Sequence, residues 1–401
     1  MTKKFLFLLA VASSLTFAAC SDDDKQVKPT PKPTGDLVVS KTVIDATADS
    51  SSYDIVVTSK DKWNAAVDTS AKWCTVAVNS VRGKNTLKVN VTENNAKTKR
   101  SAKITVSAGK LTRVITVNQA PEPNYAVVEL TATPANGEVK LYAKAKKLKV
   151  DWGDGKNNTY TAANAEIKHT YADNKERTIV VKAENLTQFG DKVIADTVNA
   201  LMVGKIQKIN FTSTPDLKAV RIVNNNLAEI NLNGATALET LWVYSNNITT
   251  LDVSKNAALT NLNCAKNQLK TLDVSKNIAL KSMNCNDNQI DSLNASKNAA
   301  LTNLNCAKNQ LKTLDVSKNI ALKSMNCNDN QIDSLTVTKN TALTALYCNN
   351  NNLVESAINS LFASLPKNPS TKDVYSVSII GNPGSAAGDK KIATDKGWTV
   401  L

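Results

Sequence analysis

The side chains that could carry chemistry in this 401-residue chain are one histidine and seven cysteines. His169 follows two acids, Asp151 and Asp154, and such a group could act as an acid–base pair or hold a metal ion. The sequence contains no second histidine and no nucleophile in a recognisable turn. We therefore predict that His169 is a hydrogen-bonded structural residue, and we predict no metal and no cofactor.

Five of the cysteines recur at intervals of 21 residues. Two earlier repeats hold Ile222 and Val243 at the same position, so the position is apolar and should face inward. Stacked coils would place the Cα atoms roughly 4.8 Å apart, within disulfide range, but all the Cβ vectors would point the same way. We predict buried free thiols, and not a redox or metal ladder, at Cys264, Cys285, Cys306, Cys327 and Cys348.

The elements that position these cysteines are internal repeats. Residues 254–293 recur unchanged at 296–335, and each block contains two 21-residue repeats such as Leu259-x-x-Leu262-x-Cys264-x-x-Asn267-x-Leu269. This pattern resembles the leucine-rich repeat, which implies a solenoid over residues 201–355. The cysteine column resembles that of internalin-type surface adhesins. A ladder of asparagines would bond the turn backbone at Asn225, Asn246, Asn267, Asn288, Asn309, Asn330 and Asn351.

Side chains that alternate with the core residues should face outward from the concave strands of the solenoid. Four asparagines occupy this outward row, although two of them are copies produced by the duplication. Amide groups between aromatic side chains would suit a glycan or an extended peptide. The predicted ligand-binding residues are Arg221, Trp242, Tyr244, Asn263, Asn284, Asn305, Asn326 and Tyr347.

The last residues, 356–401, leave the 21-residue period. They predict an amphipathic helix at 356–365, a strand at 374–380 and a short helix at 391–396, with Trp398 buried. A solenoid needs such an atypical unit to cover its last coil, so we predict an α/β cap.

Residues 36–121 contain short alternating strands separated by polar turns, which is typical of a β-sandwich. The segment has Trp63 and Trp73 and closes with Val117-Asn118-Gln119-Ala120, and in these features it resembles the BACON domain of Bacteroidetes proteins. That family is proposed to bind carbohydrate or mucin. The tryptophans could stack on sugars or lie in the core, and we favour the core; Cys74 should be a small buried residue.

Residues 122–200 contain Trp152-Gly153-Asp154-Gly155 and then His169-Thr170-Tyr171. This combination resembles the PKD-type immunoglobulin-like domain, and the resemblance implies a second β-sandwich in which these residues are structural.

The N-terminus has Lys3 and Lys4, an apolar run over residues 5–19, and then Cys20. It resembles a lipoprotein signal peptide (1–19), from which Phe17 is a mild departure, followed by a lipidated Cys20 and a Pro/Lys/Thr tether (20–35). The acidic triplet after Cys20 resembles the export signal of Bacteroidetes surface lipoproteins. We expect an outer-membrane protein that is anchored by lipid and faces the exterior.

The formal charge is +14, but the lysines are spread at repeat spacing, so we predict no nucleic-acid partner. The expected fold is multidomain and mainly β, with two immunoglobulin-like sandwiches followed by a leucine-rich-repeat solenoid and its cap. We predict a monomeric, non-catalytic surface binding protein or adhesin with an extracellular protein or glycan ligand. The alternative is an accessory glycan- or mucin-binding protein of a polysaccharide-utilisation system that binds through the BACON-like module.

Overall fold

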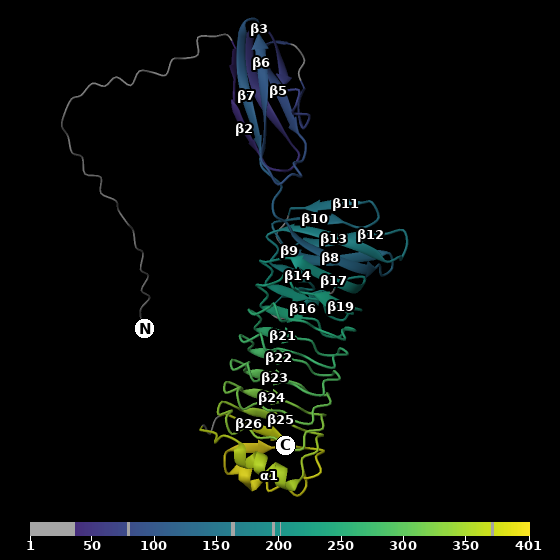
Figure 1. The fold of residues 1–401 in the computed structure, drawn as a ribbon, viewed down its shortest axis with the longest axis vertical. Helices are drawn as coiled ribbons and strands as arrows, with labels where there is room; N and C mark the ends of the chain where they lie inside the picture. The colour runs from purple at the N-terminus through teal and green to yellow at the C-terminus, as the bar shows by residue number, and fades with distance from the viewer. Residues whose placement is uncertain (1–36, 78–80, 162–164, 195–196, 201, 370–372) are drawn as a thin grey trace, which may run out of the picture. The chain divides into compact units, whose positions relative to one another are not determined.

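The computed structural model describes residues 37–77, 81–161, 165–194, 197–200, 202–369 and 373–401 (Figure 1). The chain divides into two compact units, Met1–Pro123 and Asn124–Leu401, close to the predicted boundary after residue 121. The predicted signal peptide (1–19), the lipidation site Cys20 and the tether (20–35) lie outside the described residues and stay predictions. None of the helices among the described residues is long and apolar enough to cross a membrane.

The N-terminal unit is built from seven strands in the order β2-β7-β6-β3-β5-β4, with β1 paired to β3. The longest strand, β3, pairs with β5 over its first half and with β6 over its last five residues, so it connects the two parts of the sheet. The strands are β1 (Leu37–Val39), β2 (Val43–Ala46), β3 (Ser51–Val67), β4 (Cys74–Ala77), β5 (Val81–Val91), β6 (Arg100–Ala108) and β7 (Leu111–Gln119).

The two tryptophans of this unit lie in different environments. Trp63 is 1% exposed and belongs to the hydrophobic cluster of the unit, as predicted for a core residue. Cys74 is buried in the same cluster. Trp73 is only partly buried, and the guanidinium carbon of Arg100 lies 4.5 Å from the centroid of its ring. One face of Trp73 is therefore occupied by the protein itself.

The C-terminal unit begins with two sheets. One has the order β11-β10-β13-β8-β17-β19, and the other begins β12-β9-β14 and continues through β18 into the repeats. The strands are β8 (Ala126–Thr133), β9 (Glu138–Lys144), β10 (Lys147–Asp151), β11 (Asn157–Tyr160), β12 (Ala165–Thr170), β13 (Arg177–Glu184), β14 (Gln188–Gly190), β15 (Lys192–Ile194), β16 (Thr197–Ala200), β17 (Lys205–Ser213), β18 (Ala219–Arg221) and β19 (Glu229–Asn231).

The predicted boundary between residues 200 and 201 does not separate two domains in the structure. Strand β14 pairs in parallel with β18, and β17 pairs with both β8 and β19. The edge strands of the predicted second sandwich are therefore used as the first rungs of the solenoid sheet. A single hydrophobic cluster runs from Val128 to Trp398, so residues 122–200 and the repeats share one core.

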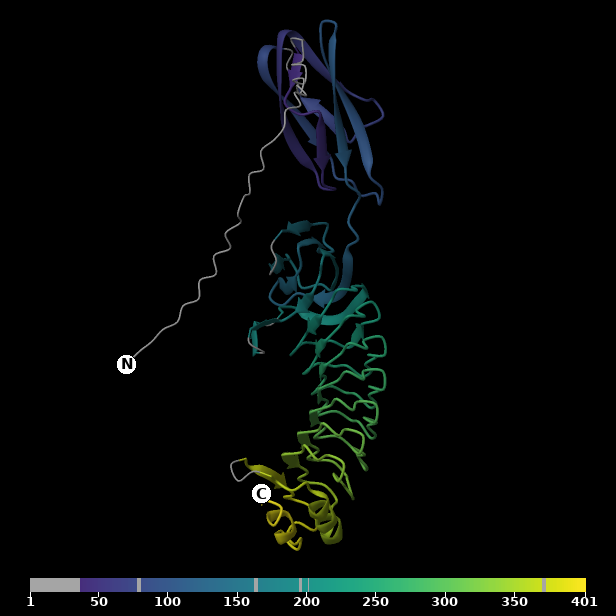
Figure 2. The same ribbon diagram turned by 90° about the vertical axis from the view of Figure 1, so that its left-hand side faces the viewer.

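Each repeat contributes one three-residue strand to a parallel ladder on the inner, concave side of the solenoid (Figure 2). The central residue of each strand is buried and its two neighbours are partly or fully exposed, which is the alternation expected of a strand with one buried face. The strands are β20 (Thr240–Trp242), β21 (Asn261–Asn263), β22 (Ser282–Asn284), β23 (Asn303–Asn305), β24 (Ser324–Asn326) and β25 (Ala345–Tyr347).

The predicted asparagine ladder closes the turn after each strand. In Asn309, the Nδ2 group donates to the carbonyls of Cys285, Cys306 and Ala307 at 3.1 Å, and Oδ1 accepts from the N–H of Ile290 at 3.0 Å. The residue just before each ladder asparagine has a positive φ, between 50° and 59°, although none of these residues is glycine. The asparagine bonds therefore hold a backbone conformation that the local sequence does not favour.

The cap consists of α1 (Glu355–Ser364), β26 (Tyr375–Ser378), α2 (Lys391–Thr394) and β27 (Trp398–Val400). These elements match the predicted helix, strand and short helix, and Trp398 is buried. The cap also continues the solenoid, because β26 and β27 add two parallel strands after β25. Asn382 donates to the carbonyls of Cys348 and Ile379 and so extends the asparagine ladder, which the 21-residue spacing did not predict because the helix interrupts it.

Candidate binding face

The strand register places the predicted outward residues side by side across the solenoid. Arg221 aligns with Trp242, Trp242 with Asn263, and the alignment continues without a shift to Tyr347. All of these side chains are half-buried. Successive residues of the row lie about 4.8 Å apart, because they occupy neighbouring strands of one ladder.

The four asparagines of this row share one hydrogen-bonding pattern. Each Oδ1 accepts the backbone N–H two residues further on, at 3.0–3.2 Å. No Nδ2 group of the four donates a hydrogen bond to another described residue. The side chains are therefore oriented by the turn, and their N–H groups remain available to a ligand.

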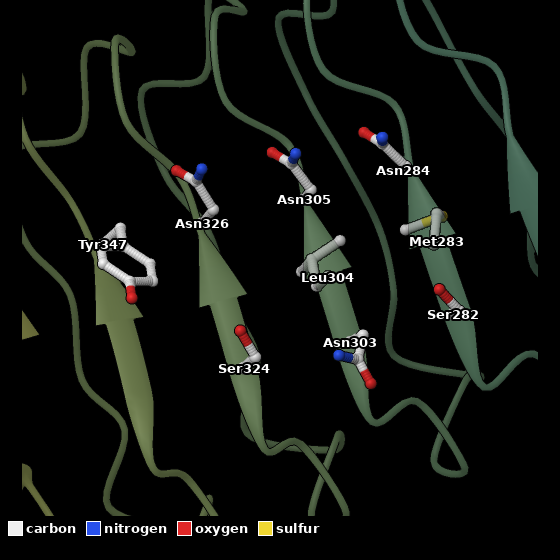
Figure 3. A pocket seen from close by; sticks show the side chains of 9 residues that line it. All are labelled: Ser282, Met283, Asn284, Asn303, Leu304, Asn305, Ser324, Asn326 and Tyr347. Atoms are coloured by element: carbon white, nitrogen blue, oxygen red, sulfur yellow. The ribbon is translucent and has the colours of Figure 1, made fainter. Parts of the chain in front are cut away.

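A shallow hollow of about 330 Å³ lies on this face between β22 and β25. Figure 3 shows the amides of Asn284, Asn305 and Asn326 along one side and the ring of Tyr347 at one end. The buried side chains of Met283 and Leu304 belong to the same lining. Its full lining is Ser282, Met283, Asn284, Asn303, Leu304, Asn305, Ser324, Asn326 and Tyr347.

The other end of the row is aromatic and is supported by its neighbours. The Trp242 indole N–H donates to Asn261 Oδ1 at 3.1 Å, and the guanidinium carbon of Arg221 lies 5.2 Å from the Trp242 ring centroid. Tyr244 is half-buried nearby, and burial, reinforced by the negative charge of Asp191, raises the pKa of its phenol. Trp242 is thus held in place and remains partly exposed.

Charge is absent from the whole strand face between β20 and β25. Three rows, each with one position per repeat, make up this face, and none of their 18 positions carries a charged residue, whereas 21% of the chain is charged. Charged residues return on both flanks, for example at Lys281 and Lys266. The rows are Thr240, Asn261, Ser282, Asn303, Ser324 and Ala345; Trp242, Asn263, Asn284, Asn305, Asn326 and Tyr347; and Tyr244, Ala265, Asn286, Ala307, Asn328 and Asn349.

His169 has the structural environment that the sequence predicts. Its Nε2 lies 2.8 Å from Asp154 Oδ2, and its side chain is 10% exposed. The ring stacks on Trp152 at 5.0 Å and meets the edge of Tyr171 at 4.5 Å. The hydrogen bond from His169 lowers the pKa of Asp154, and the Tyr171 hydroxyl donates to the carbonyl of Trp152. These contacts close the turn around Asp154 and leave the imidazole packed between aromatic rings.

The five repeat cysteines form a buried column of free thiols. Burial raises the pKa of Cys285 and Cys327 to about 12, and it raises the pKa of the other three thiols well above its usual value. The thiolate is the reactive form of cysteine, so this column serves as packing and not as a nucleophile or metal ligand.

Two features of this unit were not found from the sequence. Asp191 is buried, and its two carboxylate oxygens accept the N–H groups of Met202 and Val223, each at 2.6 Å. Burial raises the pKa of Asp191 to about 6.

The second feature is another asparagine ladder, which follows the 21-residue period and could have been found from that period. It consists of Asn256, Asn277, Asn298, Asn319 and Asn340, whose Nδ2 groups donate to carbonyls of the preceding coil.

The comparisons with known proteins concern parts of the chain. Residues 61–120 match the family model BACON, described as a "putative binding domain, N-terminal". The matched residues lie within the N-terminal unit. No curated protein matches the chain.

Among solved structures, the chain is similar to the functional domain of InlJ from Listeria monocytogenes, which includes a cysteine ladder: 25% identity, TM-score 0.36, with 50% of each chain covered. It is also similar to a leucine-rich-repeat protein of Leptospira interrogans, at 19% identity and TM-score 0.40, covering 48% of this chain and 58% of that one. A Bacteroides ovatus GH5 xyloglucanase shares 25% identity over 21% of this chain and 19% of its own, with TM-score 0.20. The chain spans about half the length of the InlJ structure.

Proposed function

We propose that this protein is a non-catalytic binding protein whose solenoid captures an extended, uncharged ligand, a neutral glycan, on its concave strand face. The binding residues would be the amides of Asn263, Asn284, Asn305 and Asn326 between two aromatic ends. Trp242 with Tyr244 forms one end, and Tyr347 forms the other.

The observation that carries this proposal is the uncharged, hydrogen-bonding band on β20–β25. A charged ligand would find no counter-charge within the three rows of the band, whereas sugar hydroxyls can accept from the free amide N–H groups. Aromatic faces suit the apolar faces of sugar rings, and partly exposed aromatic residues on an ordered scaffold are typical of binding hot spots. An uncharged extended peptide is the second ligand class that the same band could hold.

We further propose that the protein is a lipoprotein of the outer membrane that faces the cell exterior as a monomer. Support comes from the sequence, in which a short apolar run of signal-peptide length ends at Cys20 and is followed by an extended tether. Acyl chains on Cys20 would hold the protein at the membrane, because each buried methylene adds roughly 0.8 kcal/mol and several chains together anchor stably.

The family match favours one alternative. A BACON domain is described as a binding domain, so the N-terminal unit could instead bind a glycan or mucin for a polysaccharide-utilisation system. Trp73, which is only partly buried, would be a candidate aromatic contact. Arg100 already covers one face of Trp73, which leaves a single face for a sugar ring.

An array of neutral glycans, acidic glycans and peptides tests these proposals. Because each unit has a hydrophobic core of its own, residues 37–123 and 124–401 can be prepared separately and compared with the full chain. We expect neutral-glycan signals from the full chain and from residues 124–401. Signals from residues 37–123 alone would support the BACON alternative, and signals from peptides alone would overturn the glycan proposal.

A further inference from the structure

One lysine recurs at the same position in the turn before each of the strands β21 to β25. It lies in a Ser/Thr–Lys–Asn turn six residues before the next strand, and its side chain is exposed in all five coils. We call this column the lysine row: Lys255, Lys276, Lys297, Lys318 and Lys339.

The backbone beneath the lysine row is held in register by the second asparagine ladder. Each lysine is followed directly by a fully buried asparagine of that ladder. In Asn298, for example, Nδ2 donates to the carbonyls of Val274 and Asn277 in the preceding coil at 3.1 and 2.8 Å. The same bonds recur in the neighbouring coils, so the lysine Cα atoms follow one another at the coil spacing, about 5 Å.

The lysine row carries the same charge in all five coils, whereas two other charged columns of the solenoid alternate in sign. One column runs Lys266, Asp287, Lys308, Asp329, and a second runs Lys270, Asp291, Lys312, Asp333. In both columns, opposite charges lie on adjacent coils and offset each other. In the lysine row, five positive charges follow one another, and no lysine of the row forms an ion pair with another described residue.

The acids nearest to the lysine row lie three residues before it in the same turn. Asp252, Asp273 and Asp315 each accept the N–H of the serine two residues further on, at 2.8–2.9 Å. These hydrogen bonds lower the pKa of the three carboxyl groups. The equivalent positions before Lys297 and Lys339 are uncharged, Asn294 and Thr336. The five turns therefore carry five cations and three anions. The anions attract Lys255, Lys276 and Lys318, so the row keeps an excess of positive charge that is largest at Lys297 and Lys339.

We propose that the lysine row is a second binding site, which takes a linear acidic glycan through its sulfate or carboxylate groups. A straight column of regularly spaced ammonium groups matches a polymer with regularly spaced anions, because each ion pair that forms releases counterions. Two observations disfavour nucleic acid. Residues 222–401 contain no arginine, the residue most used to read bases, and no Ser/Thr–Lys–Asn turn contains an aromatic residue on which a base could stack.

This site is independent of the ligand proposed for the strand face, since the two share no residue. The test uses the full chain with heparin as the acidic glycan, dextran as the neutral control, and a DNA duplex. One variant replaces the five lysines of the row by glutamine. A charge-matched control replaces five other exposed lysines by glutamine: Lys266, Lys270, Lys281, Lys308 and Lys312.

We expect the chain to bind heparin with an affinity that falls steeply with salt concentration, and we expect the five substitutions of the lysine row to leave its response to dextran unchanged. The row variant should bind heparin at least 10-fold more weakly at 50 mM salt, and the slope of log affinity against log salt should fall by roughly one for each lysine that pairs with a sulfate in the parent. The control variant should stay within about 3-fold of the parent. Circular dichroism should show the same melting transition for all three chains, because every substituted lysine is exposed.

Three results would overturn the proposal. Equal losses in the row variant and the control would mean that net charge alone attracts heparin. Tighter binding of the DNA duplex than of heparin through the same five lysines would assign the row to nucleic acid. Absence of heparin binding by the parent chain would show that the row is only a solvated surface. None of these results bears on the strand face, which the neutral-glycan array tests.

Discussion

The N-terminal unit and the solenoid differ in how far a tryptophan is buried and in which residues adopt a positive φ in tight turns. Trp63 of the N-terminal unit is 1% exposed in a closed core, whereas Trp242 of the solenoid is half-buried on an open strand face. Among the described residues of the N-terminal unit, positive φ values occur only at Gly83 and Gly109. In the solenoid, the positive-φ residue of every coil is asparagine, serine, lysine or aspartate.

This difference reflects how the two structures are stabilised. The N-terminal unit has no internal repeat, so each of its positions has its own partners. Glycine can therefore occur only at the turns that need it. The solenoid repeats one coil, and a side chain that appears once per coil becomes a column. Columns of buried asparagines hold the backbone, so the outward columns are not needed to stabilise the coil.

The largest effect that we expect separates a core tryptophan from a surface one. Trp63→Ala should lower the free energy of unfolding of the N-terminal unit by about 3–5 kcal/mol, because it empties a buried site the size of an indole. Trp63→Phe should cost much less, since it keeps most of the packing and removes an indole N–H that has no hydrogen-bond partner among the described residues. Denaturant unfolding measures both changes, and a loss below 1 kcal/mol for the alanine variant would place Trp63 outside the core.

A second pair of substitutions compares two asparagine columns four residues apart. Asn309→Ala should destabilise the solenoid by about 2–4 kcal/mol, because the buried N–H of Ile290 loses its acceptor and three carbonyls each lose one of two donors. Asn305→Ala should cost less than about 1 kcal/mol, since it removes one bond at a half-buried site. Equal losses in thermal or denaturant unfolding would contradict the assignment of Asn309 to structure and Asn305 to binding.

The third prediction concerns pH and the start of the solenoid. Burial raises the pKa of Asp191 to about 6, so the folded chain binds this proton more tightly than the unfolded chain, in which the pKa is about 3.9. The stabilisation is therefore fully present below about pH 4 and is lost as pH rises through about 6. Between pH 4.5 and 7.5 the C-terminal unit should lose about 2 kcal/mol of unfolding free energy.

Asp191→Asn provides the control for this prediction. This variant should be less stable than the parent chain at all pH values. Its amide NH₂ group would face one of the two N–H groups, of Met202 or Val223, that the carboxylate oxygens of Asp191 accept. Its stability should also vary less over this pH range. A parent chain that gains stability over the same range would contradict the assignment.

The smallest effect concerns the turn residues. Lys308 has a φ of 53°, so Lys308→Gly should relieve backbone strain and raise stability by up to about 1 kcal/mol. Lys318→Gly, at an exposed position outside the positive-φ set, should be neutral or destabilising. A calorimetric comparison of melting temperatures distinguishes the two, and a lower melting temperature for Lys308→Gly would show that the asparagine ladder already removes the strain.

Features that recur in every coil were the ones best predicted from the sequence. The 21-residue period identified the cysteine column, the first asparagine ladder and the outward row, because a fixed spacing in a solenoid places residues on one line. It predicted less well what occurs once. The continuity of β14 with β18 depends on long-range strand pairing, and Asp191 depends on burial by distant segments. The extra ladder residue Asn382 was missed because a helix interrupts the spacing.

The central claim is that the strand face of the solenoid binds a neutral glycan. The most direct test measures glycan-array binding by a full chain that lacks the aromatic residues at both ends of this face. Trp242→Ala combined with Tyr347→Ala should abolish the neutral-glycan signals of the parent chain, while Trp73→Ala in the N-terminal unit should leave them unchanged. Circular dichroism of each chain confirms folding. Signals that survive the double substitution and disappear with Trp73→Ala would contradict the account and assign binding to the N-terminal unit.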